Sequence, residues 1–325
     1  MTSRTEAGPF TAGHVRPESK VRSYARLGKL DVYDYYPSIA VALSAVLLPV
    51  AGLPPTTLVT LALFLFGAVF VIVAMVALDD VTGYRDGSDA ANYGPDNPLR
   101  NKLRKPLVAG TLTLREALGF GWTTAVIGAV LWAAAMATAP HLPTWTVVLV
   151  VALFTVSIQY SYGLKISYHG FQEIFLAGLG AGLVMGAYGL AAGHFSGFLF
   201  VQGVLFGFGP LLFGVYSNTN DIPGDRAVGR LTVACLVSPK GNAVFIGSLS
   251  VAEFLIGAVS SAVGIAPWWF VLLMLPVTAL RARQYLTGFR QGDIMRARRL
   301  GFPAHRVSTV LLITANLIVG AGASV

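Results

Sequence analysis

Long apolar runs alternate with short polar connections along most of the chain. Most of these runs approach the roughly 20 residues that a helix needs to span a bilayer, although the eighth and ninth are shorter. The pattern predicts an all-α integral membrane protein, a bundle of about nine transmembrane helices. The predicted spans are 37–53, 56–78, 115–139, 144–162, 172–192, 196–216, 243–264, 267–280 and 308–325.

The composition agrees with a chain that is solvated by the lipid bilayer. The 325 residues are 55% hydrophobic and only 12% charged, whereas soluble domains carry about 25% charged residues. The formal net charge is +8, but no basic domain gathers these charges, so we expect no nucleic-acid partner. The single cysteine, Cys235, excludes an internal disulfide framework and a cysteine-based zinc site.

Basic residues are distributed unevenly between the two sets of connections. Lysine and arginine occur in the N-terminal segment and after the second, fourth, sixth and eighth spans, so all 23 lie on one side or at its helix ends. Cytoplasmic loops carry this excess of positive charge. The pattern predicts insertion in the cell membrane with a cytoplasmic N-terminus. Residues 1–30 are interpreted as a polar, mobile cytoplasmic tail without a signal peptide, and 31–325 as the transmembrane domain.

Two acidic clusters lie on the predicted cytoplasmic side, after the second and the sixth spans. The second cluster, in YSNTNDIPGDRAVGR, places Asn218, Asp221 and Asp225 on one face if the sixth helix continues. Because the clusters are four spans apart, two similar helical units would bring them together at one cytoplasm-facing mouth. The first cluster, in DDVTGYRDGSD, contains Asp79, Asp80, Asp86 and Asp89.

Carboxylates on facing helices are typical of a site for a hard divalent cation. Mg²⁺ prefers oxygen ligands and usually bridges to the phosphates of a substrate. Lys165, Arg226 and Arg230 lie close by in the sequence and are candidate phosphate ligands. These residues together indicate a diphosphate site at a membrane surface. The alternative is that the acids are solvated side chains at ordinary helix ends.

Both clusters resemble the signature motifs of the UbiA superfamily of intramembrane prenyltransferases. The first is similar to N-D-x-x-D-x-x-x-G-x-D, the form of the 1,4-dihydroxy-2-naphthoate polyprenyltransferase branch. Asp80 and Asp89 match this form, whereas Asp79 replaces the usual Asn and Gly83 replaces the middle Asp. Asp86, which follows one turn later, is a candidate to supply the missing carboxylate.

Other segments extend the resemblance over roughly residues 35 to 320. SNTNDIPGDRAVGRLT is similar to the second motif of the same branch, with Ser217 and Asn220 in place of the usual Asn and Arg. RKPLVAGTLTLREAL resembles the family segment before the third helix, and YSYGLKISYHGFQE occupies the place of a loop that bears tyrosine and lysine.

The resemblance implies a function and a set of site residues. The expected reaction is Mg²⁺-dependent ionisation of an isoprenyl diphosphate, followed by transfer of the prenyl group to a small acceptor, an aromatic compound or quinone precursor. The implied catalytic residues are Asp80, Asp221, Lys165 and Tyr162. The implied substrate-binding residues are Arg104, Lys105, Lys165, Arg226, Arg230, Asn218 and Tyr84. The implied Mg²⁺ ligands are Asp79, Asp80, Asp86, Asp89, Asp221 and Asp225.

Two other functions remain open at this point. A terpene cyclase on the same scaffold would use no acceptor, because the double bonds of the substrate itself would attack the allylic cation. A transporter is less favoured, because its key charges usually lie near the bilayer midplane. Glu253 is the main intramembrane exception, and it is interpreted either as an acceptor contact or as a protonated, hydrogen-bonded side chain. The basic run 281–299 is expected to contact anionic headgroups. The sequence specifies neither the prenyl chain length nor the oligomeric state.

Overall fold

The computed structural model describes residues 19–29, 34–48, 53–93 and 102–322, and this part of the chain contains helices and no strands. The principal helices are α1 (Lys20–Gly28), α2 (Ser38–Val46), α3 (Pro55–Asp86), α4 (Ser88–Asn92), α5 (Leu114–Thr138), α6 (Thr144–Ile158), α7 (Gln172–Ala192), α8 (Gly197–Ala227), α9 (Val233–Leu236), α10 (Pro239–Ala262), α11 (Phe270–Leu273), α12 (Leu275–Tyr285) and α13 (Ile294–Gly322). Short 3₁₀ turns occur at Lys102–Arg104 and Ile166–Tyr168, and a π-helical turn follows α12 at Leu286–Arg290.

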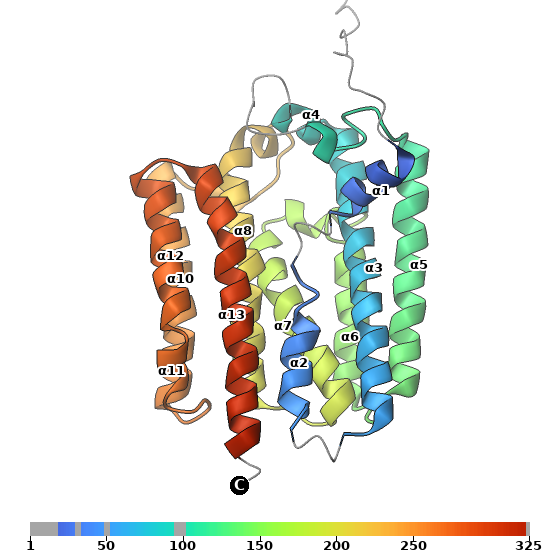
Figure 1. Ribbon diagram of the computed structural model, residues 1–325. Coiled ribbons are helices and arrows are strands. Elements are labelled where there is room, and N and C mark those ends of the chain that lie inside the picture. The colour runs from blue at the N-terminus through green and yellow to red at the C-terminus, as the bar shows by residue number, and fades with distance from the viewer. Residues whose placement is uncertain (1–18, 30–33, 49–52, 94–101, 323–325) are drawn as a thin grey trace, which may run out of the picture.

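The long helices stand side by side in a bundle, and the short helices α1 and α4 lie across one end of it (Figure 1). Within the described ranges, six helices, α3, α5, α7, α8, α10 and α13, are long and apolar enough to cross a membrane. The other predicted spans contain the shorter helices α2, α6 and α11–α12. The all-α membrane fold is therefore confirmed, whereas the count of nine spans stays a prediction.

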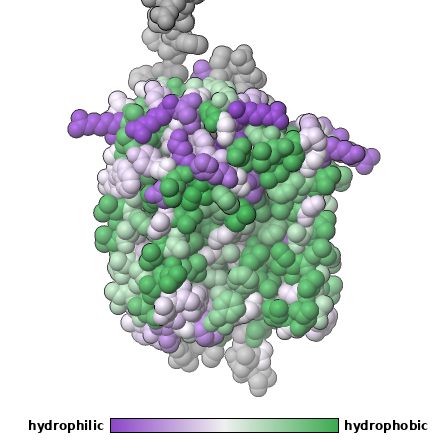
Figure 2. All heavy atoms as spheres, turned by 180° about the vertical axis from the view of Figure 1, so that it is seen from behind, coloured by the Kyte–Doolittle hydropathy of each residue, from purple (hydrophilic) through white to green (hydrophobic). Residues whose placement is uncertain are grey.

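Polar residues concentrate at one end of the molecule. On the face shown in Figure 2, the strongly hydrophilic side chains gather at the end that carries α1 and α4, and hydrophobic side chains cover the flank below. Apolar residues such as Val130, Val148 and Ile174 are exposed on the surface of the bundle. Apolar side chains are stable there because lipid rather than water surrounds them.

Two helices continue beyond their apolar stretches and carry the acidic residues with them. The predicted second span ends at residue 78, but α3 continues to Asp86 and ends at Gly87, whose φ of 83° suits a helix C-cap. The predicted sixth span ends at residue 216, but α8 continues to Ala227. Both acidic clusters are therefore built on rigid helical backbone or directly beside it.

The centre of the bundle depends on close contact between α7 and α8. A methyl group added at Gly180 of α7 would lie 2.6 Å from the Cα atom of Gly207 on α8, a distance that real Cβ atoms do not show. Small residues permit this approach, which maximises packing between helices where lipid removes the hydrophobic driving force. The contact fixes the start of α7 beside the acidic end of α8.

The basic run 281–299 does not lie entirely at the headgroup level, contrary to the expectation from its charge. The Arg281 side chain is 1% exposed and donates from Nε and Nη2 to the two carboxylate oxygens of Glu253, at 2.8 and 3.2 Å. This pair joins α12 to α10. It forms because an intramembrane charge is costly unless a partner satisfies it.

Candidate active site

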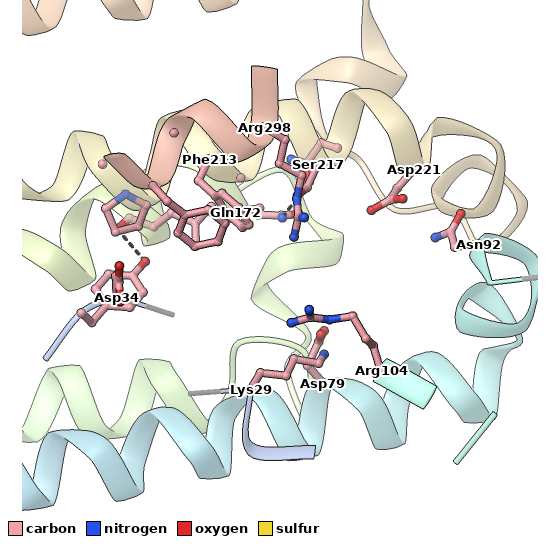
Figure 3. A pocket seen from close by; sticks show the side chains of 18 of the residues that line it. Lys29, Asp34, Asp79, Asn92, Arg104, Gln172, Phe213, Ser217, Asp221 and Arg298 are labelled. Atoms are coloured by element: carbon pink, nitrogen blue, oxygen red, sulfur yellow. Dashed lines mark hydrogen bonds between the residues drawn. The ribbon is translucent and has the colours of Figure 1, made fainter. Parts of the chain in front are cut away.

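A cavity of about 140 Å³ opens among the polar ends of α3, α7, α8 and α13. Asp79 on α3, Asp89 on α4 and Asp221 on α8 all line it, so residues from both acidic clusters face one space. Figure 3 shows Lys29, Asp79 and Arg104 on one wall, and Ser217, Asp221 and Arg298 on the facing wall. Lys105 and Asn218 also line the cavity.

Two lysines hold the first acidic cluster together. Asp80 is 1% exposed, and its Oδ1 accepts hydrogen bonds from Lys29 Nζ and, at 2.7 Å, from Lys105 Nζ. Lys105 Nζ also lies 2.6 Å from Oδ1 of Asp89. Burial lowers the pKa of Lys105, but the Asp80 and Asp89 carboxylates outweigh it and raise that pKa well above its usual value. Burial raises the pKa of Asp89 to about 6, against the lowering influence of Lys105.

The space above Gly83 is occupied by a carboxylate from farther along the chain. A Cβ atom at Gly83 would lie 2.7 Å from the carboxylate carbon of Asp89. Asp86, the candidate suggested by the sequence, instead accepts hydrogen bonds from the hydroxyls of Tyr168 and Ser88 and does not line the cavity. The structure therefore places Asp89, and not Asp86, in the space beside position 83.

Arg230 connects the two acidic clusters. Its Nη2 donates to Oδ1 of Asp79 at 3.3 Å, and its Nη1 lies 4.0 Å from Oδ1 of Asp225. The guanidinium also lies over the ring of Tyr168, with 4.3 Å between its carbon and the ring centroid. Asp225 is buried behind the cavity wall, so it contacts Arg230 without reaching the open space.

A chain of hydrogen bonds fixes Asn218 at the beginning of the second cluster. Gln172 Nε2 donates to Asn218 Oδ1 at 3.0 Å, and Asn218 Nδ2 donates to Glu173 Oε1 at 3.3 Å. The same oxygen of Glu173 accepts from the backbone N–H of Val233 at 3.2 Å. Glu173 therefore orients Asn218.

Eight residues of the predicted site do not line the cavity: Asp80, Tyr84, Asp86, Tyr162, Lys165, Asp225, Arg226 and Arg230. The Tyr84 side chain is 45% exposed, and Tyr162 packs edge-on against Trp122 beside an apolar cluster. Lys165 lies over the ring of Tyr168, and Arg226 donates to the carbonyl oxygen of Cys235. Tyr160 does line the cavity.

Sequence reasoning missed several residues of the cavity wall. Lys29 lies in the segment that was interpreted as a mobile tail, although α1 in that segment buries Ser23, Leu27 and Gly28. Arg298 lies in the basic run that was assigned to headgroups. No local pattern marks either residue, since each belongs to a polar stretch and reaches the site only through helix packing. Other missed residues include Asp34, Tyr35, Asn92, Tyr93, Gln172, Phe213, Phe302 and His305.

The first cluster contains carboxylate oxygens that are available as ligands for a hard cation. Asp80 Oδ2 and Asp89 Oδ2 are buried and accept no hydrogen bond from the described residues. Buried carboxylate oxygens without a partner are unusual, and they fit a divalent ion with oxygen ligands. Within the described residues, no three acidic, histidine or cysteine side chains already converge as a closed metal site. A cation bound here would therefore need oxygens from a substrate to complete its coordination.

The UbiA prenyltransferase family model matches residues 38–318, which is most of the chain. The chain belongs to the UbiA prenyltransferase family. No curated protein matches it by sequence.

Solved structures of other UbiA homologues share its fold. The apo UbiA homologue from Aeropyrum pernix K1 is 18% identical, with a TM-score of 0.63 over 89% of this chain and 98% of that one. The homologue from Archaeoglobus fulgidus bound to DMAPP and Mg²⁺ is 13% identical, with a TM-score of 0.58 over 89% and 99%. The Archaeoglobus fulgidus homologue has also been solved with GPP and Mg²⁺. That structure is 14% identical, with a TM-score of 0.57 over 92% of this chain and 99% of that one.

Proposed function

We propose that this UbiA-family protein ionises an isoprenyl diphosphate in a Mg²⁺-dependent reaction and transfers the prenyl group to a small acceptor. The observation that carries the proposal is the shared cavity. Carboxylates from both motifs, Asp79 and Asp89 on one side and Asp221 on the other, line one space together with Arg104 and Lys105. Carboxylates and cations that face each other in this way can hold metal ions and diphosphate oxygens at the same time.

The acidic residues that would hold Mg²⁺ are Asp79, Asp80, Asp89 and Asp221. Support comes from the unpartnered oxygens of Asp80 and Asp89 and from the related Archaeoglobus fulgidus protein bound to Mg²⁺ with DMAPP or GPP. When bound, Mg²⁺ supplies positive charge where the leaving pyrophosphate becomes more negative. In this proposal Asp225 acts indirectly by holding Arg230, and Asp86 acts by holding Tyr168.

Basic side chains of this chain would bind the diphosphate and stabilise its departure. Lys29, Arg104 and Lys105 line the cavity beside the acids, and charges fixed before the reaction stabilise a transition state without reorganisation. The bond between C1 and the diphosphate oxygen breaks, and its electron pair leaves with pyrophosphate. A π electron pair of the acceptor ring then forms the new bond to C1. The proton lost from the attacked ring carbon passes to a pyrophosphate oxygen.

Residues outside the cavity wall have supporting roles in this proposal. Lys165 and Arg226 add positive charge around the site, and Tyr162 and Tyr84 pack beside it or at its surface. The mouth of the cavity and the N-terminus face the cytoplasm, because lysine and arginine gather at that end. The acceptor is a small aromatic molecule or quinone precursor, as in the dihydroxynaphthoate branch that the motifs resemble.

The test uses purified protein in detergent with Mg²⁺ and geranyl diphosphate, with and without an aromatic acceptor. Pyrophosphate release is expected in the wild type and is lost in Asp80→Asn and in Asp221→Asn. Asp293→Asn is the matched control, since Asp293 is exposed and only caps the start of α13. If both site variants release pyrophosphate at the wild-type rate, the enzymatic proposal is wrong. A cyclic product formed without acceptor would identify a membrane terpene cyclase instead.

A further inference from the structure

A second and much larger cavity lies between α6, α7, α8 and α10, with a volume of about 1010 Å³. It opens at the surface of the bundle, since Val148 and Ile174 line it and are themselves exposed. The small residues Ala177, Gly178 and Ala181 of α7 also line it, and a Cβ atom added at Gly178 would meet nothing within 4 Å. This cavity is called the α7 groove below.

The α7 groove is separate from the polar cavity, because neighbouring residues of α7 face the two spaces. Gln172 and Leu176 line the polar cavity, whereas Glu173 and Ala177 line the groove. Close contact between α7 and α8 closes the wall between them, since a Cβ atom at Gly207 would lie 2.2 Å from the carbonyl oxygen of Ala177. The groove is therefore not part of the space assigned to the diphosphate chemistry.

The length of the groove matches one leaflet of a bilayer. The groove follows α7 from Glu173, in the first turn of the helix, to Met185. At a rise of about 1.5 Å per residue this distance is about 18 Å, and half of the hydrocarbon core of a bilayer is roughly 15 Å thick. Apart from Glu173, the described residues that line the groove are apolar or glycine. These properties suit a hydrocarbon chain that lies parallel to α7.

A buried carboxylate lies at the end of the groove where α7 begins. Glu173 is 7% exposed and is the one charged residue among the described residues that line the groove. Its Oε1 accepts hydrogen bonds from the backbone N–H of Val233 and from Asn218 Nδ2, both of which are uncharged donors. Its Oε2 is buried and has no partner in the described part of the chain. Because a buried charge is costly without a partner, this oxygen suits a cationic donor from a ligand.

A primary ammonium group fits this carboxylate better than the other common head groups of phospholipids. An ammonium group combines a positive charge with N–H donors, as the side chain of lysine does. The quaternary ammonium of choline has the charge but no N–H group, so it leaves Oε2 of Glu173 without a hydrogen bond. A glycerol head group has no positive charge to balance the carboxylate. The charge and the missing donor together select an ethanolamine head group.

We propose that the α7 groove binds a phospholipid of the ethanolamine class. Its ammonium group donates to Oε2 of Glu173, and an acyl chain lies along α7 against Gly178 and Ala181. Because Oε1 of the same carboxylate holds Asn218, which lines the polar cavity, the bound head group and the candidate active site share one side chain. The inference does not depend on the proposed prenyl transfer, since lipid binding is measured without substrate.

The test measures lipid binding to the purified protein in detergent by native mass spectrometry. The probes are palmitoyl-oleoyl phosphatidylethanolamine, phosphatidylcholine and phosphatidylglycerol, which share the same acyl chains. We expect the wild type to bind one ethanolamine lipid about fivefold or more tightly than either of the others, because it alone offers charge-assisted N–H donation. Equal affinities for the three lipids would show that the head group is not recognised, and the inference would be wrong.

The head-group contact is tested with Glu173→Gln, which removes the negative charge and keeps the size of the side chain. We expect the binding of the ethanolamine lipid to weaken by about fivefold, to the level of the choline lipid, because the charge-assisted contact is lost. Glu116→Gln is the matched control, since Glu116 is also a first-turn glutamate but is already paired with Lys20. If Glu173→Gln retains the preference for ethanolamine, Glu173 is not the partner of the head group and the inference fails.

The position of the acyl chain is tested with Gly178→Leu, which fills the groove and leaves Glu173 in place. We expect all three lipids to bind about fivefold or more weakly. The matched control is Gly119→Leu on α5, another exposed glycine where an added Cβ meets nothing within 4 Å. Unchanged lipid binding in Gly178→Leu would place the lipid elsewhere and overturn the inference. A wild-type dimer without bound lipid that Gly178→Leu converts to a monomer would assign the groove to a second copy of the chain, which also contradicts it.

Discussion

The space that a side chain at position 83 would fill is taken by the carboxylate of Asp89. Asp89 is held there by Lys105, which also pairs with Asp80. The three residues form a compact unit in which a lysine between two carboxylates offsets one of their two negative charges. Glycine at position 83 is therefore a requirement of this arrangement and not the simple loss of a ligand.

Gly83→Ala tests that requirement. The added methyl group would lie 2.7 Å from Asp89 Cγ, so the carboxylate must move away from Lys105. Displacing a group that orients a metal site typically costs 10–100-fold in affinity, and we expect the Mg²⁺ requirement for pyrophosphate release to rise by about tenfold or more. The measurement is the Mg²⁺ dependence of release from geranyl diphosphate. Gly119→Ala on α5, where the methyl group meets nothing within 4 Å, should leave it unchanged.

The helices α10 and α12 are joined by the pair between Glu253 and Arg281, inside the part of the bundle that is surrounded by lipid. Arg281 also donates to Gln284, whose own amide donates to the backbone oxygen of Ala297 on α13. Three helices therefore depend on one buried guanidinium. This arrangement gives Glu253 a structural partner and accounts for a charge that would otherwise be costly in this environment.

Removing one partner of the Glu253–Arg281 pair should destabilise the bundle more than removing both partners. Glu253→Ala leaves Arg281 buried without its carboxylate, and we expect a loss of about 3–5 kcal/mol in unfolding free energy. The double variant Glu253→Leu with Arg281→Met removes both charges and should recover most of that loss. Thermal unfolding in detergent measures both. Equal stability of the single and double variants would show that the pair does not hold these helices.

At the scale of the whole molecule, packing balances the charges of the first cluster before any ligand binds. Asp79, Asp80 and Asp89 lie beside Lys29, Lys105 and Arg230, so three carboxylates meet three cations among the described residues. A divalent ion alone finds little net negative charge there. A diphosphate brings the negative charge that makes the ion favourable, so the two ligands should bind cooperatively.

Metal and diphosphate binding should therefore be coupled. We expect inorganic pyrophosphate to tighten Mg²⁺ binding by about tenfold or more, and Mg²⁺ to tighten pyrophosphate binding by the same factor, as linkage demands. Isothermal titration of the detergent-solubilised protein measures both directions. Chelation with EDTA should abolish pyrophosphate release. Equally tight Mg²⁺ binding with and without pyrophosphate would contradict the charge argument.

The single cysteine of the chain allows a direct test of its orientation. In a Cys235→Ser background, Leu142→Cys in the connection after α5 should react with a membrane-impermeant maleimide in intact cells. Lys240→Cys at the start of α10 should react only after permeabilisation. Both positions are exposed, so access alone does not separate them. The opposite pattern would reverse the orientation predicted from the basic residues.

The sequence by itself determined the all-α membrane fold, the approximate spans, the segregation of basic residues and the two acidic clusters. These are local properties, because an apolar run or a cluster of aspartates can be read within one helix length. The spacing of Asn218, Asp221 and Asp225 predicted one shared face only on the condition that the sixth helix continued, and α8 does continue to Ala227.

Only the tertiary structure decided which polar residues share the cavity and which partners neutralise them. Lys29 and Arg298 come from opposite ends of the chain and line the same space. Tyr84 and Asp86, only a few residues from Asp89, do not line it. The physical reason is that helix rotation and packing set the direction of each side chain. Two residues of one motif can therefore face different surroundings, and residues from distant helices can meet around one ligand.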